Sequence, residues 1–359
     1  AGAFSPTPLT VQFGNKYAGT VSGQVDQVVY NQSLINSIQA SKVNVKLTEF
    51  QKEENEINVI YNTATAFYQV LILQEQLELI KTNEETIGEL LEVQKLKYEK
   101  GVLPASSYNR VKVNFNNIVS QKQQVEMQLK MGLENLKNVL GMSPEQEIRI
   151  DQSLEIENEP QMPEQYAVQV KNRVDYRILE TNIELQQFDL RRKRAQYIPT
   201  IGLYARYGAN AFGNDLNSTF NDWYDFGAVG LKINVPIFSG MSKYQQVKQS
   251  TLNLDNMRQN LELNSRMYAL NLKNAQTQLN ASYLTLLSNQ ENLDLAESVY
   301  TETQLQYEKG TASLSDLLNA DYARKEAQSN YINSMLNYYI ARIDIEKSKG
   351  TLLEFTNNL

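Results

Sequence analysis

The 359-residue sequence contains neither cysteine nor histidine. The absence of cysteine excludes a disulfide framework and any thiolate site. The absence of histidine also removes the usual zinc ligands and the Ser–His and Cys–His catalytic arrangements. We therefore expect no enzymatic activity, no bound metal and no cofactor.

Concentrated charge and long apolar runs are missing as well. The net charge is −7 and the lysines and arginines are scattered, so no nucleic-acid partner is expected. No run reaches the roughly 18 apolar residues that a transmembrane helix requires. The mean hydropathy of −0.47 is typical of a soluble chain, but membrane β-barrels score equally low because their strands alternate. No leader is visible at Ala1, which predicts a mature or truncated chain.

What the sequence does contain is an internal two-fold repeat. The motif Tyr-x-x-Gly ends a helical pattern at Gly101 and again, 209 residues later, at Gly310. Gly141 and Gly350 each follow 40 residues beyond these turn glycines. The chain is therefore interpreted as two copies of one unit, each folding a long helix back on a second one.

Apolar residues recur every seven positions in four stretches without proline: 32–100, 105–140, 242–308 and 314–349. Sustained heptads of this kind predict long coiled-coil helices. Between the first two stretches, Gly101 ends one helix and Pro104 permits the next to begin.

Strict alternation of apolar and polar residues predicts β-strands elsewhere. It runs from Thr20 to Asp26, is preceded by the alternating Leu9, Val11 and Phe13, and returns in a hairpin over 197–238 with a polar loop from Asn210 to Asp222. Two strands of about ten residues joined by a polar loop fit a membrane hairpin. The strands are too few to close a barrel, so either they pack on a soluble partner or several chains pool them.

The predicted organisation has two parts. The first repeat, 1–163, holds a strand, the helix 32–100, a turn, the helix 105–140 and an irregular connection. The second, 164–359, holds a short helix from about Glu164 to Arg194, the hairpin 197–238, the helix 242–308, a turn, the helix 314–349 and a C-terminal tail.

These motifs resemble the TolC-type outer-membrane efflux proteins. The resemblance is carried by Tyr-x-x-Gly at both turns, Asp-Leu-Leu-x-Ala at 316–320, Arg-Val-Asp at 173–175, Pro199 opening the hairpin, and Val-Pro-Ile-Phe-Ser-Gly at 235–240. It covers essentially the whole chain. It implies a mixed, mainly α fold: a homotrimer with a 12-stranded β-barrel in the Gram-negative outer membrane and an α-barrel of helical hairpins in the periplasm.

The resemblance also implies a function. The channel would conduct drugs, small molecules or secreted protein, with a periplasmic adaptor, an inner-membrane pump and outer-membrane lipid as partners. Relative to the family, residues 9–26 supply only the second strand of the first half, so a leading helix and most of one strand are expected to be missing. The alternative is a soluble periplasmic coiled-coil adaptor or scaffold.

The helix turns are the expected periplasmic pore mouth. At Asp316 the family has an aspartate that rings the mouth, although a helix N-terminal aspartate also stabilises the helix dipole. Tyr98 and Tyr307 are read as packing residues or as gate elements, and both turn glycines as structural. The charged contacts that hold the mouth closed in the family are not expected here, because three positions lack the family's charges: Ser107, Ala312 and Asn319.

Aromatic residues on the hairpin are candidates for a girdle at the membrane interface, or are ordinary strand aromatics. They are Tyr197, Tyr204, Tyr207, Trp223 and Tyr224. The basic run 191–194 is a solvated helix end next to the helix dipole, or it faces lipid headgroups, or it lines the tube.

Overall fold

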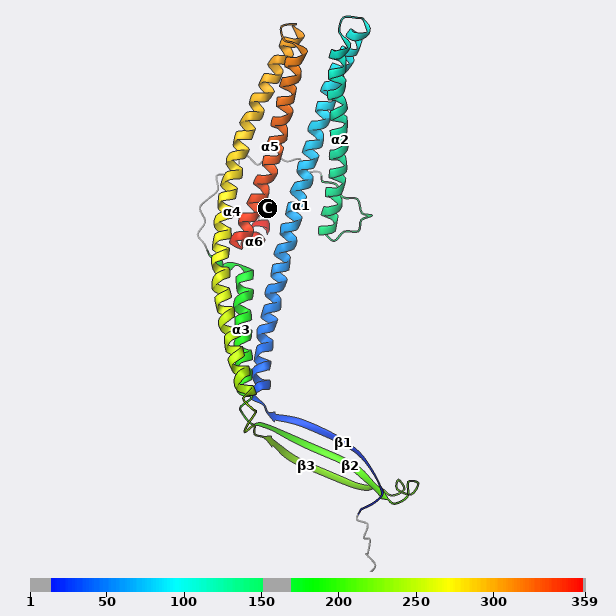
Figure 1. Ribbon diagram of the computed structural model, residues 1–359, viewed down its shortest axis with the longest axis vertical. Helices are drawn as coiled ribbons and strands as arrows, with labels where there is room; N and C mark the ends of the chain where they lie inside the picture. The colour runs from blue at the N-terminus through cyan, green and yellow to red at the C-terminus, as the bar shows by residue number, and fades with distance from the viewer. Residues whose placement is uncertain (1–13, 151–168, 358–359) are drawn as a thin grey trace, which may run out of the picture. The chain divides into compact units, whose positions relative to one another are not determined.

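The computed structural model describes residues 14–150 and 169–357. The predicted alternation of Leu9, Val11 and Phe13 lies outside them, as does most of the irregular connection. The described chain is mainly helical with one small sheet (Figure 1). Its described residues divide into two compact units, one within Ala1–Lys46 and Thr181–Arg258 and one within Leu47–Glu180 and Gln259–Leu359.

Four long helices occupy the heptad stretches, within one residue of the predicted bounds. They are α1 (Gln32–Glu99), α2 (Ala105–Val139), α4 (Ser242–Glu308) and α5 (Leu314–Lys349). The 68 residues of α1 span about 100 Å at 1.5 Å per residue. Figure 1 shows α2 running back beside α1 and α5 running back beside α4.

Each hairpin is closed by a shared apolar seam. Between α1 and α2 the seam consists of Ile80, Ile87, Val111, Ile118 and Val125. Between α4 and α5 it includes Leu279, Leu286, Ile332 and Tyr338, and Ile72 of α1 joins this second cluster. The hairpins therefore pack on one another as well as within themselves.

The shorter segments differ from their predictions. In the described residues α3 is Val174–Ala195, preceded by the 3-10 turn η1 (Val170–Asn172), so the start predicted near Glu164 is not where this helix begins. Arg173 breaks the helical path because its backbone is extended, with ψ 136°. The C-terminal segment predicted as a tail contains the helix α6 (Leu352–Asn357), which follows Gly350 in the left-handed conformation.

The sheet is antiparallel with strand order β1-β2-β3. The strands are β1 (Tyr17–Tyr30), β2 (Thr200–Gly213) and β3 (Tyr224–Asn234). The prediction of a loop starting at Asn210 was wrong, because β2 continues to Gly213 along β1. Asn210 still pairs with Thr20 in the ladder, and its side-chain oxygen accepts a hydrogen bond of 2.9 Å from the Thr20 hydroxyl.

The strand register divides the sheet into an apolar and a polar face, since paired residues share a face and neighbours alternate. Leu203 lies opposite Leu231, and Ala205 lies between Val25 and Val229. The other face carries Arg206, paired with Gln24 and Ala228. No helix in the described part of the chain combines the length and the apolar character that crossing a membrane takes.

Candidate functional site

The first helix turn is closed by a left-handed glycine. Gly101 has φ 71°, and the amide of Val102 donates to the Lys97 carbonyl over 2.9 Å. The rings of Tyr98 and Tyr108 stack 5.5 Å apart across the turn. Tyr98 therefore has a packing partner within its own hairpin, as one of its two predicted roles requires. Ser107 lies in the first turn of α2, where its amide donates to the Pro104 carbonyl.

The second turn has the same backbone but a stronger cap. Gly310 has φ 77°, and Ser313 begins α5 with a capping box. The Ser313 hydroxyl and amide donate to Asp316 Oδ2 over 2.7 and 3.0 Å, and the Asp316 amide donates back over 3.2 Å. These hydrogen bonds from Ser313 hold the pKa of Asp316 below its ordinary value. Asp316 is exposed and caps the helix.

Two polar contacts join the hairpins next to the turns. Gln94 of α1 is fully buried and donates to the Tyr307 hydroxyl of α4 over 2.7 Å. Arg110 of α2 donates to the hydroxyl of Ser315 on α5 over 3.0 Å. Tyr307 thus holds the two hairpins together, whereas Tyr98 contacts only its own hairpin among the ring contacts described.

A buried charge cluster lies about two turns further along α5. Asp321 is 1% exposed and accepts from Lys325 over 2.6 Å and from Arg324 over 3.1 Å. Asn114 of α2 donates over 3.3 Å to Oδ2 of Asp321, the oxygen that also accepts from Lys325. Burial lowers the pKa of Lys325, and the carboxylate of Asp321 opposes that shift. The cluster ties α5 to α2.

The same cluster reaches the first and fourth helices. Arg324 donates to the amide oxygen of Asn83 on α1 over 2.9 Å, and its guanidinium lies 4.0 Å from the ring centre of Tyr300 on α4. Asn83 also donates to Gln328 over 3.1 Å. Four helices are therefore joined through polar groups inside an otherwise apolar seam.

Sequence reasoning missed this cluster, although one signal was present. Arg324 occupies a position in an apolar heptad ladder, as do Glu84 and Lys122. The latter two form an ion pair of 2.6 Å between α1 and α2. A charge at a ladder position is expensive to bury alone, so it signals an inter-helix partner. The partners themselves could not be identified because they lie far away in the sequence.

The remaining predicted mouth residues are uncharged, so they cannot form ion pairs that would hold the mouth closed. Asn319 is exposed, and Ala312 and Ser107 are half-buried beside their turns. The structure therefore brings Tyr307 and Asp316 into defined contacts and leaves these three as turn and helix-start residues.

The predicted aromatic girdle does not form one group. Tyr204 and Tyr207 are three residues apart on β2, so their side chains point to opposite faces of the sheet. Tyr197 lies at the helix end of the sheet, under the ammonium of Lys243. Trp223 and Tyr224 lie at the loop end, where two further aromatic residues contact them: Phe220 and Phe212.

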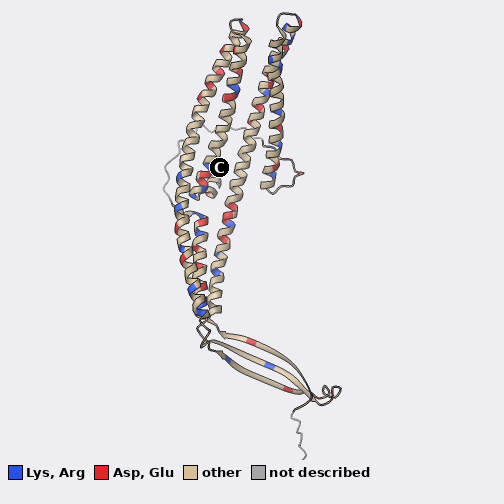
Figure 2. Ribbon diagram, viewed as in Figure 1, with Lys and Arg blue, Asp and Glu red and all other residues tan. Residues whose placement is uncertain are grey.

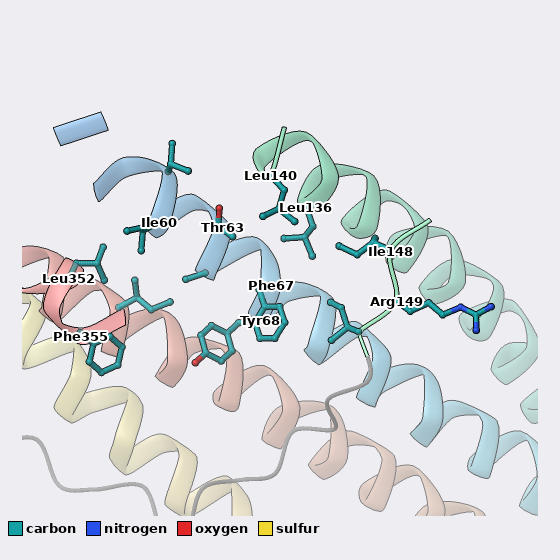
Figure 3. Close-up of a pocket in the computed structure, with 14 residues that line it drawn as sticks. Ile60, Thr63, Phe67, Tyr68, Leu136, Leu140, Ile148, Arg149, Leu352 and Phe355 are labelled. Atoms are coloured by element: carbon teal, nitrogen blue, oxygen red, sulfur yellow. The ribbon is translucent and has the colours of Figure 1, made fainter. Parts of the chain in front are cut away.

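A mostly apolar cavity of about 730 Å³ lies where α2 ends and α6 packs. Figure 3 shows Phe67 and Tyr68 of α1, Leu136 of α2 and Phe355 of α6 around it. Burying apolar surface of this kind against another apolar surface is favourable.

Comparison with protein families supplies an identity for this arrangement. A family model described as outer membrane efflux protein matches residues 170–351. The outer membrane protein TolC of Vibrio cholerae is 20% identical over 332 residues, covering 91% of this chain and 76% of that protein. The alkaline protease secretion protein AprF of Pseudomonas aeruginosa is 20% identical over 344 residues, covering 95% and 71%.

Solved structures share the fold. The CmeC outer membrane channel of Campylobacter jejuni matches with a TM-score of 0.74 and 16% identity, covering 94% of this chain and 78% of that one. The outer membrane protein VceC of Vibrio cholerae matches with a TM-score of 0.72 and 15% identity, covering 93% and 86%.

Proposed function

This chain belongs to the outer membrane efflux protein family and is an outer-membrane channel rather than an enzyme, and we propose that three copies assemble to form it. The sheets of the three copies close one 12-stranded membrane β-barrel, and the helical hairpins form an α-barrel in the periplasm. The described sheet has three strands, so a 12-stranded barrel takes one further strand from each copy.

The observation that carries the trimer is the uncovered apolar face of the sheet. Val229 is 77% exposed and Leu231 58%, and no other layer packs on them among the described residues. A large apolar face is unfavourable in water, and open edges are not tolerated in lipid. Lipid against the apolar face and neighbouring copies at the edges satisfy both requirements.

The helices support the same proposal. Ile38, Val45 and Val59 stand at heptad positions of α1 yet are each more than half exposed. A coiled-coil seam buries such positions against a partner helix. The helices of a neighbouring copy supply that partner, and they also cover the apolar cavity beside Phe67.

In this proposal the repeats 1–163 and 164–359 each contribute one helical hairpin to the tube. The turns at Gly101 and Gly310 form the periplasmic mouth and dock an adaptor linked to an inner-membrane pump. The relatives' names speak of efflux and of protease secretion, so drugs, small molecules and secreted protein are the proposed cargo.

Two measurements on the full-length protein test the channel. Detergent-purified particles are expected to have three-fold symmetry, and the protein is expected to conduct ions across a planar bilayer. A protein that fractionates without detergent and runs as a monomer would contradict the channel and favour a soluble adaptor.

A matched pair of variants separates the two roles of Asp316. In the trimer, three copies of its carboxylate ring the mouth and favour cations. Asp316→Asn removes the charge but leaves an amide oxygen that can accept from Ser313, whereas Ser313→Ala removes the serine hydroxyl of the cap and keeps the charge. We expect cation preference in the bilayer to fall in Asp316→Asn only. Unchanged selectivity in Asp316→Asn would leave Asp316 a capping residue.

A further inference from the structure

The end of α3 and the start of α4 form a band of positive charge. Residues 189–198 and 239–248 hold six cationic side chains and one acidic one, a local charge of +5. We call these six residues the basic collar: Arg191, Arg192, Lys193, Arg194, Lys243 and Lys248. Figure 2 shows basic residues gathered on these two helix ends.

Hydrogen bonds within the collar join its two helix ends but leave most of its positive charge without a carboxylate partner inside the collar. Lys193 donates to Gln246 over 3.2 Å, and Lys243 donates to the carbonyl of Gln196 over 2.7 Å, so α3 and α4 are joined here. Asp189 is the one carboxylate, and it accepts from Arg192 over 2.6 Å. The other five cations therefore have no carboxylate among residues 189–198 and 239–248.

An exposed apolar loop runs from β3 into this collar. Ile237 is 93% exposed and Phe238 85%, which is unusual for side chains of this size. The next turn is held in a left-handed conformation at Gly240, φ 58°, and at Met241, φ 65°. The amide of Ser242 then donates to the Ser239 carbonyl over 3.1 Å and starts α4.

Large apolar side chains next to unneutralised cations match the chemistry of a phospholipid surface. Ile and Phe side chains enter the boundary of the acyl chains, while Lys and Arg bind the phosphates above it. We propose that the basic collar and the loop at Ile237 and Phe238 bind the phosphate headgroups of an anionic phospholipid membrane. This inference rests on the proposed function, which places the sheet in a membrane.

A second copy of the chain fits the collar less well. Copies in a closed ring stand level with one another, so a collar would face the collar of its neighbour and like charges would meet. The acidic residues Asp215, Asp222 and Asp225 lie in the β2–β3 loop and at the start of β3, which is the end of the sheet away from the collar. At that end β2 pairs Asn210 with Tyr224, whereas at the collar end it pairs Thr200 with Asn234. Lipid phosphate supplies the missing negative charge.

The absence of cysteine from the chain makes a direct test possible. The full-length variant Phe238→Cys is labelled with an environment-sensitive fluorophore and reconstituted in vesicles of phosphatidylglycerol and phosphatidylcholine. Leu263→Cys, at an exposed position of α4, is the matched control. We expect brominated lipid to quench the Phe238 label several-fold more than the control. A blue-shifted label that lipid does not quench would mean that a second copy covers the loop, and the proposal would fail.

A second experiment tests the charges. The double variant Arg191→Glu/Arg194→Glu is compared with the double variant Arg258→Glu/Arg266→Glu. Arg258 and Arg266 are exposed arginines of α4 that lie outside the collar. The amount of phosphatidylglycerol retained over phosphatidylcholine after detergent purification is measured for each. We expect about a tenfold loss of enrichment in the collar variant, because each cation near an anionic surface contributes a several-fold factor.

Equal enrichment in both double variants would overturn the lipid assignment. Conductance of the same preparations keeps this outcome apart from a failure of the channel itself. A collar variant that conducts normally but loses its lipid preference supports the inference. A wild-type protein that neither inserts nor conducts refutes the proposed function instead.

Discussion

Removing the carboxylate of Asp321 should loosen the joint between the two helical hairpins. In Asp321→Asn the side chain keeps its size, but Lys325 and Arg324 lose the negative charge that they share. Both cations are largely buried, with side-chain exposures of 19% and 12%. Neither can regain full hydration without opening the seam.

The size of the effect follows from the burial. Removing one partner of a buried ion pair costs about 3–5 kcal/mol, because an uncompensated charge stays behind. The lower figure corresponds to roughly a hundredfold increase in the equilibrium for local opening. Surface changes cost less than about 0.5 kcal/mol, so Glu326→Gln, at an exposed position on the same helix, is the control.

Hydrogen exchange of the full-length protein in detergent measures this opening directly. Peptides that contain Asn83, Asn114 or residue 321 should exchange up to about a hundredfold faster in Asp321→Asn and unchanged in Glu326→Gln. Adding Lys325→Met to Asp321→Asn should restore part of the protection, since one buried charge is removed. Equal protection in wild type and Asp321→Asn would refute the view that this cluster joins the hairpins.

Three further outcomes are expected. Ser313→Ala should weaken the start of α5 by about 1 kcal/mol, seen as faster exchange in its first turn while the rest of the helix is unaffected. Burial, and after it the hydrogen bond to Asp344, raises the pKa of the Tyr61 hydroxyl to about 12. The neutral hydroxyl therefore stabilises the folded state fully below about pH 10, the ordinary tyrosine pKa, and this contribution is lost as the pH rises toward 12. Tyr61→Phe should therefore flatten the alkaline loss of stability in urea titrations, and an unchanged slope would contradict this. Gly350→Ala should lower the thermal midpoint, because φ 82° costs an alanine about 1–2 kcal/mol and its Cβ would lie 3.2 Å from the backbone of Arg173.

The elements that could be predicted are those set by local pattern. Heptads without proline located α1 and α4, and a glycine with φ above +70° closes the turns that the Tyr-x-x-Gly motifs predicted. Prediction from local pattern failed where pairing between strands overrides the residue composition of a segment. The Asn- and Gly-containing segment at 210–213 looked like a loop, yet β1 extends alongside it and holds it as strand.

The candidate site was predicted only in outline. The turns and Asp316 were found, but the contact of Gln94 with Tyr307 joins residues 213 positions apart, and that of Asn83 with Gln328 joins residues 245 apart. No periodicity encodes which two such positions meet. The aromatic candidates show the same difficulty, because the strand register assigns Tyr204 and Tyr207 to opposite faces.

The sequence by itself determined the four long helices, the two turns that join them, the presence of strands and the family, because each depends on spacing along the chain or on residues close together in it. Only the tertiary structure decided which polar groups are buried together, which strands pair and in what register, and that the start of α4 lies beside the basic run 191–194. These features depend on distances through space between segments that the chain separates widely. The physical reason is that a charge costs little in solvent and much inside a helical seam, and burial is a property of the packed molecule alone.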